Sequence, residues 1–390
     1  MKELFLLFIV GWLTSAVSLN QADGQVLTGL ERTDEYLPIL RGKRIGVVAN
    51  NASVVRGVNT VDTLIALECD VVKIYSPEHG FRRQVEAGLH LDNQIDSLTG
   101  VEVISLYGKK QKPSQEDLEG VDLIVFDIQD VGVRFYTYIS TLSYVMEACA
   151  EKGIPLLVFD RPNPNGFYID GPVLDSRFSS FVGLHPVPVV YGMTIGEYAR
   201  MVNGEGWLKD GIQCDLGIVP LVNWTHHTFA QLPEAPSPNL PTINAIYLYP
   251  SLCFFEGTDI SIGRGTCHPF EVFGHPAMKG FAFSFTPESI PGKSLHPPHK
   301  GELCLGLDLR EFYTTHPAMF GRINLVWLLM AFKDLGSSPD FFTAYFDKLA
   351  GTDSLQRQIL NGSTEMQIRQ SWQDDIEAFK LVRQKYLLYE

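Results

Sequence analysis

The sequence predicts an α/β protein in which a Rossmann-like, doubly wound parallel sheet is followed by a smaller α+β domain. Two observations predict the sheet: five short apolar runs without alternation, and helical patterns between them. A third observation predicts the second domain: near residue 185 the regular alternation of strand and helix signals gives way to helices mixed with short strands. The length of 390 residues also suits two domains, since single domains mostly contain ~100–200 residues.

The expected strands are rich in Val, Ile, Leu and Phe, which is typical of strands buried on both faces. They span residues 44–49, 71–75, 101–106, 123–126 and 156–159. A polar residue closely follows each run. Because the ligand crevice of an open parallel sheet lies beyond the carboxyl ends of its strands, we expect these polar side chains to meet at one edge.

Helices are expected between the strands. Residues 60–68 and 138–152 carry apolar side chains at helical spacing, residues 114–118 form a capped turn, and Gly153 ends the longest helix. Alternating strands and helices imply right-handed crossovers and a doubly wound sheet.

The second domain mixes helices with short strands. Thr194 and Glu197 form a capping box that opens a helix at 193–202. The remaining expected elements are a strand at 214–220, an irregular Pro-rich stretch at 232–241, strand-like pieces within 245–285, and amphipathic helices at 324–335 and 374–387. We therefore place a Rossmann-like domain at 27–184 and an α+β domain at 185–390.

The amino terminus has the outline of a secretory signal peptide. Lys2 precedes the apolar stretch 4–13, and Ala16-Val17-Ser18 offers a small-x-small cleavage site. The alternatives are an uncleaved anchor and an ordinary hydrophobic helix, and the stretch is shorter than the roughly 20 apolar residues of a membrane span. We expect residues 1–18 to be removed and the mature protein to be periplasmic, with no membrane contact.

Composition excludes some partners. The net charge of −14 argues against nucleic acid and anionic membranes, which demand a basic face. An anionic small ligand would need a few local Arg side chains. Six widely spaced cysteines do not form a small disulfide scaffold, although a pair between Cys267 and Cys304 stays open. The sequence does not indicate an oligomeric state.

No cofactor or metal is expected. The first strand–helix turn, residues 50–53, lacks both glycine-rich phosphate-binding patterns, so the sheet is interpreted as a scaffold without a nucleotide. His226-His227 lacks the spacing of a helical zinc pair. The chain also lacks the G-x-S-x-G pattern of serine esterases.

The segment 76–82, Ser-Pro-Glu-His-Gly-Phe-Arg, is the most specific motif. Glu78 at the end of a strand suits a general acid whose pKa is raised by burial, with His79 beside it in the substrate site. The alternative is that Glu78 caps the next turn and His79 packs against the core.

Residues 127–138 crowd polar and aromatic side chains into a strand-to-helix turn. Asp127 and Asp130 can hold sugar hydroxyls, Arg134 can bind a carboxylate, and Tyr136 and Tyr138 can stack on a ring. The alternative is an Asp–Arg pair that stabilises the turn.

Three further segments supply candidates. In the rigid stretch 160–164, Asp160, Arg161 and Asn163 are binding candidates, unless the stretch is a linker whose Asp caps a neighbour. In the second domain, the glycine-rich segment 256–266 suits a close backbone approach to a ligand. The remaining candidates of the second domain are Asn239, Arg264 and the acids Glu256 and Glu271, either of which could instead pair with Arg264.

Together these motifs resemble a bacterial family of exo-β-N-acetylmuramidases of peptidoglycan recycling. The resemblance covers residues 27–388. Its motifs are segments 76–82, 105–108, 127–138, 160–164, 180–183, 191–194, 236–239 and 256–266. It implies an active site between two domains, removal of N-acetylmuramic acid from the non-reducing end of peptidoglycan fragments, and Glu78 as the leading catalytic residue. The chain departs from the family pattern at Asp259, Ile262 and Cys267-His268.

The chemistry of such a substrate fits these residues. Muramic acid carries a lactyl carboxylate, for which Arg134, Arg161 and Arg264 are candidates. Glycoside cleavage needs a protonated acid and a second group. That group is either a carboxylate or the substrate's acetamido group, oriented by Asp127 or Glu256. Two other classes stay open, namely a non-catalytic sugar-binding protein and an amidase or esterase.

Overall fold

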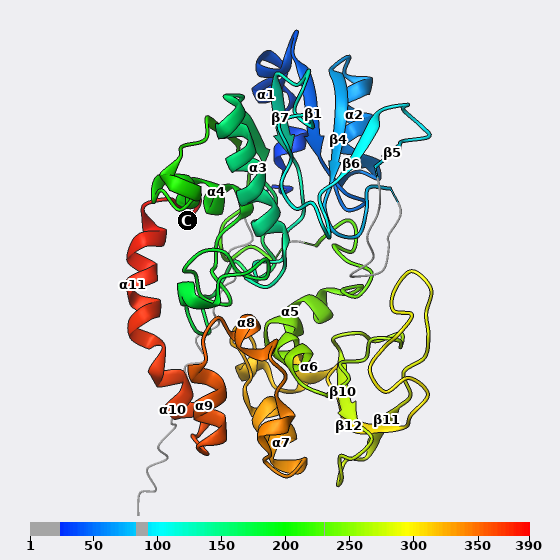
Figure 1. Ribbon diagram of the computed structural model, residues 1–390, viewed down its shortest axis with the longest axis vertical. Coiled ribbons are helices and arrows are strands. Elements are labelled where there is room, and N and C mark those ends of the chain that lie inside the picture. The colour runs from blue at the N-terminus through cyan, green and yellow to red at the C-terminus, as the bar shows by residue number, and fades with distance from the viewer. Residues whose placement is uncertain (1–23, 83–92, 230) are drawn as a thin grey trace, which may run out of the picture.

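The computed structural model describes residues 24–82, 93–229 and 231–390. The predicted signal peptide, residues 1–18, lies outside them. Figure 1 shows an upper lobe built on a parallel sheet and a lower lobe of helices with a small sheet. No helix within the described ranges is long and apolar enough to cross a membrane.

The upper lobe contains a seven-stranded sheet in the order β5-β6-β4-β1-β7-β8-β9. Its strands are β1 (Arg44–Val48), β4 (Asp70–Ser76), β5 (Gln94–Ile95), β6 (Glu102–Ser105), β7 (Leu123–Phe126), β8 (Leu156–Phe159) and β9 (Leu216–Val219). All pairs are parallel except β5 with β6. The predicted sheet class is confirmed. The strand order reverses around β1, where a ligand crevice is expected.

Helices cover both faces of this sheet. Helices α1 (Thr33–Leu40) and α2 (Thr60–Ala66) share one apolar cluster with Val47, whereas α3 (Tyr138–Lys152) and α4 (Ile195–Gly204) share another with Val48. Consecutive residues of β1 thus point into opposite cores, which is why the strand is apolar without alternation. A hairpin of β2 (Val54–Val55) and β3 (Val58–Asn59) precedes α2.

Helix α4 begins two residues later than expected because Thr194 is its N-cap. The Thr194 hydroxyl accepts from the Glu197 amide at 3.2 Å, and the Glu197 carboxylate accepts from the Thr194 amide at 3.0 Å. The predicted capping box is confirmed. The predicted strand near residue 216 is also present as β9, so the large sheet continues past the expected domain boundary at residue 184.

The lower lobe consists mainly of helices beside a three-stranded antiparallel sheet, ordered β10-β12-β11. Its strands are β10 (Val272–His275), β11 (Phe283–Phe285) and β12 (Cys304–Asp308). Its helices are α5 (Ile243–Leu252), α6 (Phe312–Thr315), α7 (Val326–Asp334), α8 (Phe346–Ala350), α9 (Ser354–Leu360), α10 (Glu365–Ser371) and α11 (Gln373–Gln384).

Helix α5 corrects one expectation, because residues 245–252 were expected to be strand-like. The Thr242 hydroxyl caps the helix by accepting from the Ala245 amide at 3.0 Å. Pro250 lies inside it and cannot donate to the carbonyl of Ile246. Asn165 donates to that carbonyl at 3.3 Å instead, so a long-range bond replaces the missing local one.

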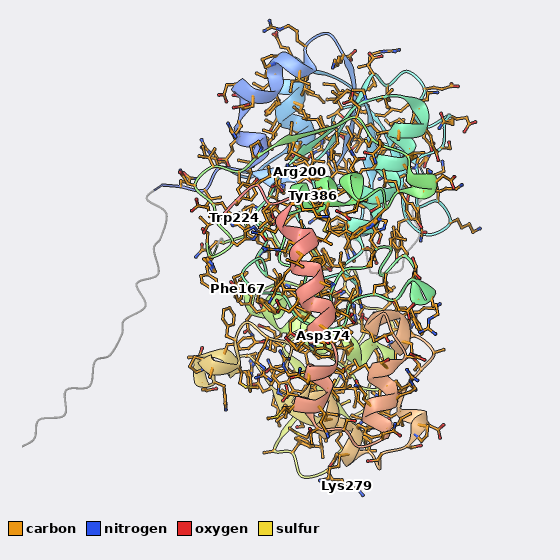
Figure 2. All side chains as sticks on the ribbon, turned by 90° about the vertical axis from the view of Figure 1, so that its left-hand side faces the viewer. Phe167, Arg200, Trp224, Lys279, Asp374 and Tyr386 are labelled. Atoms are coloured by element: carbon orange, nitrogen blue, oxygen red, sulfur yellow. The ribbon has the colours of Figure 1, made fainter. Side chains whose placement is uncertain are left out.

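Helix α11 runs from the lower lobe back to the upper lobe (Figures 1 and 2). Near its end, Arg383 donates to the Gly192 carbonyl at 2.9 Å. Residues 388 and 389 follow, and their amides donate to Glu197 of α4 at 2.8 and 3.3 Å. The carboxyl terminus is therefore part of the upper lobe.

Candidate active site

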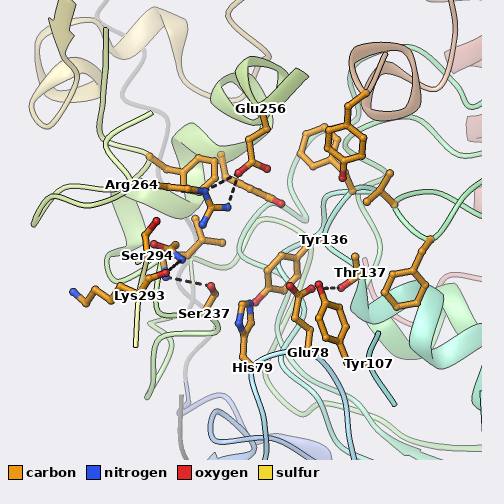
Figure 3. Close-up of a pocket in the computed structure, with 18 of the residues that line it drawn as sticks. Glu78, His79, Tyr107, Tyr136, Thr137, Ser237, Glu256, Arg264, Lys293 and Ser294 are labelled. Atoms are coloured by element: carbon orange, nitrogen blue, oxygen red, sulfur yellow. Dashed lines mark hydrogen bonds and ion pairs between the residues drawn. The ribbon is translucent and has the colours of Figure 1, made fainter. Parts of the chain in front are cut away.

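A cavity of about 770 Å³ lies at the carboxyl edge of the large sheet, bounded by residues of both lobes. Glu78, Tyr107 and Thr137 come from the upper lobe, and Glu256, Arg264 and Lys348 come from the lower lobe. The close-up in Figure 3 shows Glu78 and Glu256 on facing walls. Of the candidate residues, the cavity is lined by Glu78, His79, Tyr136, Asn239, Glu256 and Arg264.

Glu78 follows β4 in a tight turn. Pro77 precedes it, and both His79 (φ 73°) and Gly80 (φ 82°) adopt left-handed backbone conformations. A β-carbon makes this conformation costly at His79, so the turn is held by its surroundings. The Thr137 hydroxyl donates to Oε2 of Glu78 at 3.1 Å. The turn thus presents a half-buried carboxyl group to the cavity with one oxygen fixed.

Glu256 and Arg264 form an ion pair on the opposite wall. The Nη2–Oε1 distance is 2.5 Å, and Arg264 Nε donates to the same oxygen at 2.8 Å. The guanidinium lies 5.0 Å from the ring centre of Phe270. Burial lowers the pKa of Arg264, but the charge of Glu256 more than offsets this and the net pKa rises. Arg264 is therefore a permanent cation at the cavity wall.

A loop supplies a third wall that the sequence motifs did not identify. Lys293 and Ser294 line the cavity, and Asn239 fixes this loop by donating to the Lys293 carbonyl at 3.1 Å. Lys348 of α8 also lines the cavity. Isolated lysines in loops and short helices carry no local pattern, so sequence reasoning could not find them.

Aromatic side chains also line the cavity beside Glu78. The rings of Tyr107 and Phe181 are 6.5 Å apart, and Tyr144 stacks on Phe181 at 6.2 Å with 6° between the ring planes. In the sequence, the signal that could have identified Tyr107 as a cavity residue is its position directly after an expected strand. Such rings suit contacts with the apolar face of a sugar.

Asp127 and Arg161 lie outside this cavity. They form a buried pair in which Arg161 donates from Nε to Oδ1 at 2.5 Å and from Nη2 to Oδ2 at 2.9 Å. The Thr60 hydroxyl also donates to Oδ2. With both oxygens of Asp127 occupied, this pair joins β7 to β8 rather than facing a ligand.

Asp130 and Arg134 are also buried in the protein. Asp130 accepts from the Gly132 amide at 2.8 Å and from the Tyr191 hydroxyl, and burial raises its pKa to about 6. Burial lowers the pKa of Arg134 to about 9. The guanidinium of Arg134 donates at 2.7–3.0 Å to the carbonyls of Pro172, Val187, Leu349 and Ala350. The structure thus gives Arg134 four internal acceptors and no position in the cavity.

Asp160 is buried in a network at the end of β8. Its oxygens accept from the Gly196 amide at 2.9 Å, the Thr194 hydroxyl at 2.7 Å and the Tyr389 hydroxyl at 2.6 Å. Burial raises its pKa to about 6. Asp160 therefore anchors α4 and the carboxyl terminus.

The remaining three candidates fix loops near the cavity. Asn163 donates to the Met193 carbonyl at 2.7 Å. Tyr138 accepts from Asn50 at 2.8 Å. Glu271 accepts from the Thr242 hydroxyl at 2.8 Å. Their contacts are internal, so they shape the cavity without lining it. The six cysteines are free thiols, including Cys267 and Cys304.

Two family models match this chain along most of its length. The amino-terminal model of the exo-beta-N-acetylmuramidase NamZ matches residues 45–244, and the carboxyl-terminal model matches residues 247–389. A peptidoglycan beta-N-acetylmuramidase NamZ of Bacillus subtilis is 39% identical over 98% of this chain and 97% of its own length.

Two crystal structures of DUF1343 family proteins from Bacteroides fragilis are similar in fold. One has a TM-score of 0.87 and 46% identity, and the other a TM-score of 0.75 and 30% identity. Each alignment covers 94% of this chain and 99% of the other.

Proposed function

Because the chain belongs to the NamZ family of exo-β-N-acetylmuramidases, we propose that Glu78 is the general acid with which it removes N-acetylmuramic acid from peptidoglycan fragments. The protein is a glycoside hydrolase. The terminal sugar occupies the cavity between the lobes, with its glycosidic oxygen at the Glu78 carboxyl group.

The position of Glu78 carries this proposal. The carboxyl group lies at the crevice edge of the sheet, half-buried, with Oε2 held by Thr137 at 3.1 Å. A fixed carboxyl acid beside the scissile oxygen can donate its proton as the leaving group departs. The facing Glu256 supplies the second carboxylate that such chemistry uses.

Arg264 is the group that binds the lactyl carboxylate. Two of the three Arg candidates lie outside the cavity and are engaged elsewhere, since Arg134 donates to four carbonyls and Arg161 is paired with Asp127. Arg264 is held at the cavity wall by Glu256 and Phe270, which leaves Nη1 for a ligand oxygen. A charge-assisted hydrogen bond there distinguishes a muramide from a glucosaminide.

Glu256 has one of two roles in this scheme. It either deprotonates the attacking water or itself attacks the anomeric carbon, or it orients the substrate's acetamido group, which then attacks the anomeric carbon. Net inversion of the anomeric carbon, followed by NMR of the released sugar, identifies direct activation of water. Retention leaves a covalent intermediate or acetamido attack, which a thioacetamido substrate analogue separates.

We also propose export to the periplasm by cleavage after Ser18, supported by the apolar stretch 4–13 and the small residues that follow it. Amino-terminal sequencing of the protein recovered from a periplasmic fraction tests this. A mature chain that still begins at Met1 contradicts it.

Release of chromophore from an N-acetylmuramide, beside the matching N-acetylglucosaminide, tests the activity and the acid together. Wild-type protein and the control Glu119→Gln, which changes an exposed carboxylate, should cleave the muramide. Glu78→Gln should bind it without cleaving it. Saturable binding of N-acetylmuramic acid without turnover by the wild type would instead indicate a capture protein.

A further inference from the structure

A cluster of three metal-ligating side chains lies in the lower lobe, apart from the cavity. Asp259, His275 and His299 each direct one potential ligand atom to a common point, and these atoms lie within 4.8 Å of one another. The cluster has no part in the proposed hydrolysis, and its residues are separated by 16 and 24 positions in the sequence.

The backbone brings Asp259 and His275 together. Ser261 and Gly274 exchange two amide–carbonyl hydrogen bonds, each of 2.9 Å. Asp259 lies two residues before Ser261, and His275 directly follows Gly274 as the last residue of β10. This short antiparallel pairing brings the two backbone segments together, and the side chains meet where His275 Nε2 lies 3.2 Å from a carboxylate oxygen of Asp259.

A packed loop positions His299. The Glu288 amide donates to the Gly265 carbonyl at 2.8 Å, and a β-carbon at Gly265 would lie 2.5 Å from Pro297, so the loop rests directly on the glycine. His299 itself has a φ of 57°, which is unusual for a residue other than glycine. Backbone strain of this kind is held at functional sites more often than elsewhere.

We propose that Asp259, His275 and His299 bind one Zn²⁺ ion or a similar transition-metal ion. His275 Nε2 lies 3.2 Å from one carboxylate oxygen of Asp259, and His299 Nε2 lies 3.6 Å from the other. Ligand bonds of roughly 2.0–2.2 Å in a tetrahedron place neighbouring ligand atoms roughly 3.3–3.6 Å apart. One ligand atom from each of the three residues lies within 4.8 Å of the others, so small side-chain adjustments bring them to this spacing. Imidazole and carboxylate are both zinc ligands.

The exposure of the cluster suits an open coordination site. The two imidazoles are mostly covered, with 15% and 12% of their side-chain surfaces exposed, whereas Asp259 is 72% exposed. Three protein ligands therefore hold the ion from one side, and solvent water completes its shell.

Metal binding requires a shift of protons on both imidazoles. Nδ1 of His275 accepts from the Ala277 amide at 3.0 Å, and Nε2 of His299 donates to the Asp259 carbonyl at 2.6 Å. Each Nε2 carries a proton in this arrangement. Coordination through Nε2 moves the proton to Nδ1, where Glu302, 3.7 Å from His299, can accept it. At His275 the shifted proton on Nδ1 points at the Ala277 amide, so the hydrogen bond from that amide is lost when the ion binds.

An ion at this site would connect two chain segments that form walls of the cavity. Asp259 follows Glu256 by three residues, and His299 belongs to the loop that carries Lys293 and Ser294. An ion bridging Asp259 and His299 stabilises the relative position of these two segments. This effect of the ion on the wall segments does not depend on the proposed hydrolase function.

Zinc stoichiometry of the full chain tests the proposal. After dialysis against a small excess of Zn²⁺ and then metal-free buffer, the wild type should retain one equivalent of zinc. It should then unfold at a higher temperature than the same protein without zinc. His227→Gln, which removes an exposed histidine elsewhere, is the matched control and should behave identically. Asp259→Ala and His299→Gln should retain less than a tenth of an equivalent and show no thermal shift.

A variant that keeps all three ligands distinguishes loss of zinc binding from loss of folding. Glu302→Gln keeps all three ligands and should weaken zinc affinity about 10-fold, within the range found for partners of metal-bound histidines. Wild type that retains no zinc, or variants that retain as much as wild type, would overturn the proposal. Muramide hydrolysis is measured separately, so failure of the proposed activity does not affect the zinc result.

Discussion

Tyr389 donates its phenolic hydroxyl to Oδ2 of Asp160 at 2.6 Å, which joins the last-but-one residue to the end of β8. The same hydroxyl oxygen accepts from the Leu221 amide at 2.8 Å. Burial, together with the charge of Asp160, raises the pKa of Tyr389 well above its usual range. The tyrosine therefore stays neutral and serves as a hydrogen-bond donor to Asp160.

Replacing Tyr389→Phe should destabilise the protein by about 1–3 kcal/mol, because it leaves a buried carboxylate oxygen and an amide without this partner. The pKa of Asp160 should also rise above about 6, since the Tyr389 hydrogen bond lowers it. Chemical denaturation and NMR titration measure the two effects. Tyr386→Phe, which loses a bond to the partly exposed Glu205, is the control.

The stability of the protein should depend on Asp130 between about pH 4 and pH 6. Its folded pKa of about 6 lies above the unfolded value, so the folded state holds the extra proton and is favoured at low pH. This contribution is fully present below about pH 4 and is lost as the pH rises through 6. Denaturation of wild type and Asp130→Asn across this range should diverge by about 2–3 kcal/mol.

Asp34→Asn provides the baseline for that comparison, because Asp34 is exposed in the first turn of α1. Its denaturation curves should follow those of wild type. Parallel pH profiles for wild type and Asp130→Asn would show that the buried carboxyl group does not take up a proton.

Arg264→Gln should raise KM for the chromogenic muramide about 10- to 100-fold, which corresponds to loss of a hydrogen bond between charged groups. KM for the matching glucosaminide, if it is cleaved, should change little. Arg177→Gln alters an exposed Arg–Asp pair and should leave both values unchanged. Equal losses for both substrates would argue against recognition of the lactyl carboxylate by Arg264.

Thr137→Val should lower kcat for the muramide about 10-fold with little change in KM, because Glu78 loses the hydrogen bond that fixes Oε2. Thr137→Ser retains the hydroxyl and should restore most of the activity. An unchanged kcat in Thr137→Val would mean that the orientation of Glu78 is set by other contacts.

The central sheet was predictable because its information is local. The apolar runs of β7 and β8 coincide with the expected ranges, and the helix Tyr138–Lys152 ends at Gly153 as predicted. Helix α5 could not be predicted in this way. Its Pro250 is tolerated because Asn165, 81 positions away from the accepting carbonyl of Ile246, replaces the lost hydrogen bond.

The site was predictable only in part. The rule that polar residues gather at the carboxyl edge located Glu78 and also Asp127, Asp130 and Asp160. It cannot distinguish a carboxylate that faces the cavity from one that holds loops together, since that depends on distant partners such as Tyr389. The three-residue metal cluster has no sequence motif either, because its spacing is set by loops.

The hydrogen bonds of Arg134 have a consequence for how the molecule unfolds. One guanidinium joins the 172–187 segment to the carbonyls of Leu349 and Ala350. Neither half of the chain can supply all four acceptors by itself, and the amino-terminal half alone would keep only the Pro172 and Val187 carbonyls for this cation. The two parts of the chain, residues 45–244 and 247–389, should therefore unfold as one cooperative unit. Neither part should persist as a native fragment after the chain is cut between them.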